Sequence, residues 1–80
     1  MDTDLWIVIQ TDKLSQIIGK TFLGLSTSQN DAKQLAQESA KDYFSEYHIA
    51  EIDGFWCVEG LVEASNQMGY IGIYKFIKKV

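Results

Sequence analysis

The sequence contains no proline and no arginine, has one cysteine, and lacks any long apolar run. A single cysteine excludes an intramolecular disulfide, which favours a reducing compartment and a cytoplasmic protein. The first apolar run, Leu5 to Ile9, has five residues. A signal peptide or a membrane span needs a longer run, so we expect neither a leader nor a membrane partner.

The missing arginine also bears on nucleic acid, because arginine is the side chain best suited to bidentate contacts with phosphate and guanine. The net charge is −4, and its distribution is uneven. Residues 31–63 carry a net charge of −6, whereas the last seventeen residues carry +3. Phosphate binding needs dense positive charge, so we expect no direct contact with nucleic acid across the main body.

The length sets a limit on the architecture. Eighty residues, 46% of them hydrophobic, form one globular domain at most, which we place at residues 1–80. A chain of this size buries roughly 60% of its unfolded surface on folding, so its stability is small without a partner.

The middle of the chain predicts one long amphipathic helix within the stretch 28–47. Ser28 is the expected N-cap, and Asp31 stands at the capping-box position three residues later. Apolar residues then recur at helical spacing. The stripe consists of Ala32, Leu35, Ala36, Ala40, Tyr43, Phe44 and Tyr47.

The rest of the chain reads as strands rich in branched and aromatic residues. The predicted strands are 4–11, 20–27, 48–52, 55–64 and 70–80, with 12–19 as a loop or short helical turn, 65–69 as a turn, and Gly24 as a possible bulge. The order is ββαβββ. We therefore predict a single α+β domain with a mostly antiparallel sheet of four or five strands and one long helix packed on one face.

Asp53 and Gly54 predict a two-residue type I′ hairpin. In that register Ile52 lies opposite Phe55, Ala50 opposite Cys57 and His48 opposite Glu59. Alternation then makes both faces of the sheet apolar, although one helix covers about half of one face. We expect the helix to cover the face with the aliphatic side chains of the last strand. The predicted exposed face carries Phe55, Leu61, Tyr70, Tyr74 and Phe76, with Glu59 and Glu63 of the same parity.

No residue set predicts catalysis. Cys57 and His48 are diagonal at best, and Cys57 reads as a small buried hydrophobe. Glu59 and Glu63 would lie about 13 Å apart on a strand, too far for a glycosidase pair. Potential metal ligands lack zinc-type spacing, and the glycines form no phosphate loop. We expect no catalytic residues, no metal and no cofactor.

Glu38, Asp42 and Glu46 are spaced four residues apart and form a like-charged ridge on the predicted helix. One interpretation is a solvated outer face. The other is an electrostatic decoy that speeds encounter with a basic, nucleic-acid-binding protein. The sequence leaves both open.

The layout of the chain resembles a small phage-encoded anti-CRISPR protein of the type I-F inhibitor kind. The shared pattern is a strand, a capped helix (Ser28) with Ala32-Lys33 in its first turn, a strand, the Asp53-Gly54 turn, and Phe55 before Trp56. The resemblance implies a stoichiometric inhibitor of a CRISPR surveillance complex in the host cytoplasm, and not an enzyme. That inhibitor relies on basic residues, whereas this chain is acidic.

The expected function is therefore a non-enzymatic protein-binding inhibitor that occludes a host nucleic-acid-binding effector with a basic surface. The alternative is a homodimeric structural or antitoxin-like protein whose partner is a second copy. The predicted protein-binding residues are Glu38, Asp42, Glu46, Phe55, Glu59, Leu61, Glu63, Tyr70, Tyr74 and Phe76.

Overall fold

The computed structural model describes residues 2–11 and 21–79. The predicted connection at 12–19 lies outside the described residues. The elements are β1 (Asp2–Thr11), β2 (Thr21–Ser26), α1 (Gln29–Tyr43), β3 (Phe44–Ile52), β4 (Phe55–Val62) and β5 (Met68–Lys79). This order confirms the predicted ββαβββ arrangement and the α+β fold.

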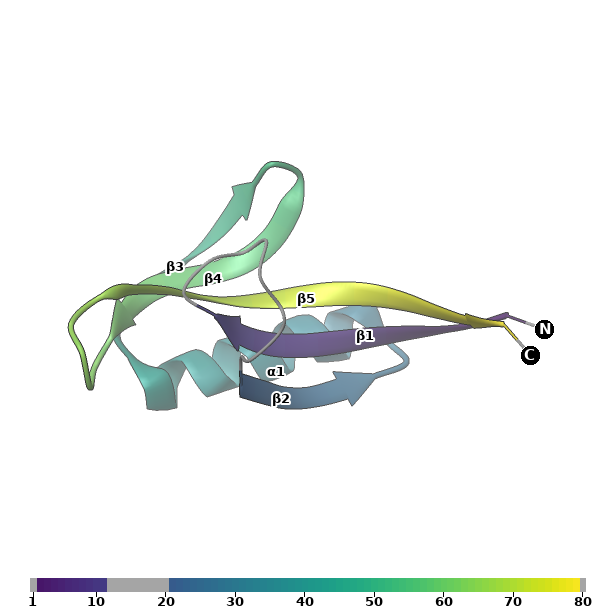
Figure 1. Ribbon diagram of the computed structural model, residues 1–80, viewed down its shortest axis with the longest axis horizontal. Coiled ribbons are helices and arrows are strands. Elements are labelled where there is room, and N and C mark those ends of the chain that lie inside the picture. The colour runs from purple at the N-terminus through teal and green to yellow at the C-terminus, as the bar shows by residue number, and fades with distance from the viewer. Residues whose placement is uncertain (1, 12–20, 80) are drawn as a thin grey trace.

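The five strands form one antiparallel sheet in the order β2-β1-β5-β4-β3. The long strand β1 pairs along its full length with the central strand β5. Figure 1 shows α1 behind β1, β2 and β5, while the β3–β4 hairpin bends away from the plane of the other strands. The hairpin therefore extends beyond the part of the sheet that α1 covers.

Ser28 caps α1 as the sequence predicts. Its Oγ accepts a hydrogen bond from the Asp31 backbone N–H at 3.3 Å, and its own N–H donates to Ser26 Oγ at 3.0 Å. Two serines thus satisfy backbone groups at the junction between β2 and the helix. Asp31 in the first turn also favours the positive end of the helix dipole.

The helix ends at Tyr43, four residues earlier than the predicted stretch, so the prediction for Phe44, Glu46 and Tyr47 is wrong. Phe44 has extended backbone angles and begins β3. Its buried ring lies against Gly60 and Gly69, a directly opposed pair on β4 and β5 that leaves room for it. Pairing with β4 and burial of this ring outweigh the helical periodicity, which alone cannot detect the glycine-lined space.

The hairpin prediction is confirmed. Asp53 and Gly54 have φ of 52° and 81°, as a type I′ turn requires, and Ile52 pairs with Phe55. Two irregularities interrupt the ladders. One lies between Phe44 and Glu46, and the other lies in β2 next to Gly24, where the sequence predicts a bulge.

Gly69 differs from its prediction as a turn residue. It lies inside β5 and pairs with Gly60, because β5 begins at Met68. The turn between β4 and β5 comes earlier, and Asn66 supplies its positive φ of 56°. Pairing of β4 with β5 runs without a shift from Cys57 to Leu61, so no bulge occurs at Gly60 or Gly72.

The core lies between α1 and one face of the sheet. Three alanines of the helix, Ala32, Ala36 and Ala40, are fully buried and allow close approach. They meet the sheet at a cluster that includes Val8, Phe44, Val58, Ile71 and Ile73. The helix thus covers the face that carries Ile71 and Ile73, as the sequence predicts.

Candidate functional site: the open face of the sheet

The sheet face opposite α1, which we call the open face, is ordered in rows that cross the strands. Directly paired residues of antiparallel strands share a face, so the registers assign each row. The apolar row is Leu25, Ile7, Tyr74 and Phe55; the middle row is Phe22, Ile9, Gly72 and Cys57; the polar row is Thr11, Tyr70, Glu59 and His48.

Four large apolar side chains of the open face are more than half exposed. The exposed fractions are 58% for Phe22, 57% for Leu25, 53% for Phe55 and 51% for Phe76. Phe55 also contacts the half-buried Tyr74, with ring centroids 6.4 Å apart. Four aromatic or aliphatic groups therefore face solvent on the side that the helix does not cover.

The middle of the open face is closed rather than exposed. The ring of Tyr74 lies over Gly72, where a Cβ atom would stand 3.1 Å from the ring. Ile9 and Cys57, the neighbours of Gly72 on β1 and β4, are buried. Tyr74 is therefore part of the structure of this face as well as part of its surface.

The polar row places three titratable side chains in contact across three strands. His48 Nε2 lies 3.1 Å from Glu59 Oε1, and the Tyr70 phenol forms a hydrogen bond with the Glu59 carboxylate. Partial burial raises the pKa of Tyr70, and the charge and hydrogen bond of Glu59 raise it further. Glu59 is thereby held between an imidazole and a phenol.

Cys57 lies beside this row on the same face of the sheet. Its side chain is fully buried, and burial raises the pKa of the thiol, with a further contribution from the Glu59 charge. Ala50, not His48, is the residue directly opposite it, as predicted. An activated thiol needs a lowered pKa, whereas burial shifts the pKa of this thiol in the opposite direction.

A hollow lies at the end of the open face near the start of β3. Its lining residues are Glu46, Tyr47, His48, Gly60, Leu61 and Met68. Leu61 and Met68 are directly paired, and Glu46 pairs with Leu61, so one carboxylate borders an apolar floor.

The predicted site residues divide into three locations. The structure gathers Glu46, Phe55, Glu59, Leu61, Tyr70, Tyr74 and Phe76 on the open face. Glu38 and Asp42 are exposed on α1, away from the sheet. Glu63 lies in the turn after β4, where its N–H donates to the Tyr43 carbonyl at 2.9 Å.

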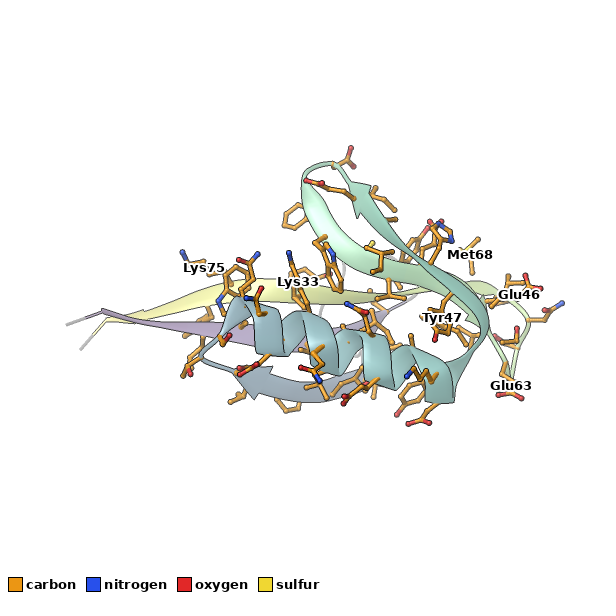
Figure 2. All side chains as sticks on the ribbon, turned by 180° about the vertical axis from the view of Figure 1, so that it is seen from behind. Lys33, Glu46, Tyr47, Glu63, Met68 and Lys75 are labelled. Carbon is orange, nitrogen blue, oxygen red and sulfur yellow. The ribbon has the colours of Figure 1, made fainter. Side chains whose placement is uncertain are left out.

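Two of these positions correct the sequence analysis. Glu46 belongs to β3, so the acidic ridge on the helix contains only Glu38 and Asp42. Glu63 lies beyond the end of β4, so its parity with Phe55 has no meaning. Figure 2 shows Glu46 and Glu63 directed away from each other at one end of the molecule.

Sequence reasoning missed Phe22 and Leu25 as members of the open face. The irregularity in β2 shifts its pairing between Gly24 and Phe22. The side chains of Phe22 and Leu25 therefore both point away from the helix, although the two residues are three positions apart. Gly24 is the signal that would have found them, because a bulge changes which residues share a face.

Among the described residues, no group of three or more His, Cys, Asp or Glu side chains is placed to hold a metal ion. No helix within 2–11 and 21–79 is long and apolar enough to cross a membrane. No protein-family model, curated protein or solved structure matches the chain. Its function must therefore be argued from the open face itself.

Proposed function

We propose that this protein is a non-enzymatic binding module that uses the open face to occupy the surface of another protein. The observation that supports this most is the exposure of Phe22, Leu25, Phe55 and Phe76 on one sheet face. A contiguous apolar surface with a polar border is typical of protein interfaces, in which aromatic residues supply much of the binding energy.

The charges on this face support a partner with a basic border. Among the side chains described on the open face, the carboxylates are Glu46 and Glu59, and His48 is the one group that can carry positive charge. Complementary charge speeds association and excludes wrong partners. A surface that binds nucleic acid carries positive charge because it contacts phosphate groups. A nucleic-acid-binding effector therefore fits this description.

The particular target that we propose is a type I-F CRISPR surveillance complex, which follows from the resemblance of layout. The acidic residues Glu38 and Asp42 take no part in the contact, because they lie on the far side of α1. They form part of the solvated outer face of the helix. The contact is carried instead by the open face and by Glu46 at its end.

The test is inhibition of DNA binding by a purified type I-F surveillance complex in a mobility-shift assay. Wild-type protein in excess should reduce DNA binding, and Phe76→Ser should weaken this effect about tenfold, as expected for one aromatic anchor. Tyr43→Ser is the matched control, because Tyr43 is 37% exposed but lies on α1. Loss of inhibition in the control, or none with wild type, contradicts this target.

The competing function, a homodimer whose second copy covers the open face, is tested by light scattering after size-exclusion chromatography. If the wild-type chain is a dimer at all concentrations and Phe76→Ser is a monomer, the homodimer is the function of the open face and the inhibitor proposal is wrong. A wild-type chain that elutes as a monomer at low micromolar concentration agrees with an open face kept free for another protein.

A further inference from the structure

The outer edge of β3 presents unpaired backbone groups. β3 pairs with β4 on one side, and no other described strand pairs with its second side. The two-residue turn makes Ile52 and Phe55 a hydrogen-bonded pair, and such pairs alternate along an antiparallel ladder. The N–H and C=O groups of Tyr47, Ile49 and Glu51 therefore point away from β4, toward the open edge.

Apolar side chains border this edge on the helix side. Tyr47 is 41% exposed and Ile49 is 54% exposed, because α1 does not reach this part of the hairpin. Figure 2 shows Tyr47 on the side of α1 and Glu46 directed away from it. A strand edge with exposed apolar side chains is a template for pairing with another chain.

On the open-face side, the charges of β3 are self-complementary. Glu46 and His48 share that face, one residue on either side of Tyr47. If two copies of β3 pair antiparallel about Tyr47, Glu46 of each copy lies opposite His48 of the other. These are non-hydrogen-bonded positions, where facing side chains approach closest. The register also pairs Tyr47 with Tyr47 of the second copy. The backbone N–H and C=O groups that point away from β4 would then form hydrogen bonds between the two copies.

We propose that β3 pairs with β3 of a second copy in this register, which joins two sheets into one of ten strands. Ser45 would face Ile49 of the second copy, and the irregularity between Phe44 and Glu46 ends the paired segment there. The occupant is a second copy rather than an unrelated strand, because this register places the Glu46 carboxylate of each copy opposite the His48 imidazole of the other. The two-fold axis is perpendicular to the sheet.

The dimer has a consequence for binding. Rotation about that axis keeps both open faces on the same side of the joined sheet. Two binding faces would then act on one large partner, and the second contact would benefit from a high effective concentration. The edge dimer and the proposed target contact share Glu46, but the dimer uses none of the four exposed apolar residues of the open face. Phe76→Ser should therefore weaken the target contact and leave the dimer unchanged.

Cysteine cross-linking reads the register directly. Three single-cysteine variants are prepared in a Cys57→Ala background: Tyr47→Cys, Ile49→Cys and Glu51→Cys. Each variant is oxidised at 100 μM protein and analysed on a non-reducing gel. Only Tyr47→Cys should form a disulfide dimer in high yield, because only residue 47 faces its own equivalent. Predominant cross-linking at residue 49 or 51, or at none of the three, overturns the proposed pairing.

Sedimentation equilibrium tests the role of the facing Glu46 and His48 side chains. Glu46→Lys should weaken the dimer about tenfold, since it removes two facing unlike pairs. The double variant Glu46→Lys with His48→Glu should regain most of that loss, whereas Glu51→Lys should leave dimerisation unchanged. Circular dichroism confirms folding, since His48 also contacts Glu59. A wild-type chain that is monomeric at 1 mM, or a dimer lost in Phe76→Ser, contradicts the proposal.

Discussion

The ring of Phe44 lies over Gly60 of the neighbouring strand, so closely that a Cβ atom on Gly60 would stand 2.7 Å from Phe44 Cδ2. The same ring approaches Gly69, which is paired with Gly60. Two glycines on adjacent strands thus form the space that receives the residue at which helix changes to strand. This contact fixes the start of β3 and, with it, the positions of Glu46, Tyr47 and His48.

Gly60→Ala should therefore destabilise the fold by about 1–3 kcal/mol, because the new methyl group meets both the Phe44 ring and the Glu46 carbonyl. Urea unfolding followed by circular dichroism measures this loss. The control is Gly54→Ala, which has no neighbour within 4 Å and should cost about 1 kcal/mol from its positive φ. An equal or smaller loss at Gly60 would show that Phe44 does not occupy this space.

Phe44→Ala should cost about 3–5 kcal/mol, because it removes a buried ring from a space that cannot collapse. Tyr47→Ala, at a residue that is 41% exposed, should change the free energy of unfolding by less than about 1 kcal/mol. A continuous helix through residue 47 would make Tyr47 part of the buried stripe. Comparable losses for the two variants would therefore favour the longer helix.

Ser28→Ala should lower the free energy of unfolding by about 1 kcal/mol, because the helix loses its N-cap acceptor for the Asp31 N–H. Ser39→Ala, a substitution inside the same helix with no capping role, is the matched control. Thermal unfolding of both variants measures the difference. An equal midpoint for the two would contradict the cap.

Stability should fall in alkaline solution. Burial raises the pKa of Cys57 above its ordinary 9.0 and that of Tyr74 above its ordinary 10.0. The unfolded chain then releases these protons at lower pH than the native chain, so the stabilisation is complete below the ordinary values and is lost as pH rises through the native ones. Unfolding free energies from pH 8 to 11 should decline. Tyr74→Phe should reduce the part of the decline that begins near pH 10, and an unchanged profile would contradict this assignment.

Local signals in the sequence determined much of this protein. Ser28 marks the start of the helix, because a side-chain acceptor is needed where backbone donors are free. Asp53 and Gly54 determine the hairpin and hence the facing of His48 with Glu59, since a two-residue turn with positive φ permits one register. Alternation divided the side chains between two faces, and the aliphatic side chains of the last strand then predicted the face that α1 covers. Each of these depends on residues close together in the chain.

The tertiary structure decided where the helix ends and what the open face contains. Phe44 and Tyr47 fit the helical stripe, but the glycine pair on β4 and β5 receives the Phe44 ring, and periodicity within one segment carries no information about distant strands. The shifted pairing of β2 likewise placed Phe22 and Leu25 beside Ile9 and Ile7. Glu46 consequently lies at the edge of the sheet and not on the helix. Its contacts depend on the pairing between strands and not on the sequence around it.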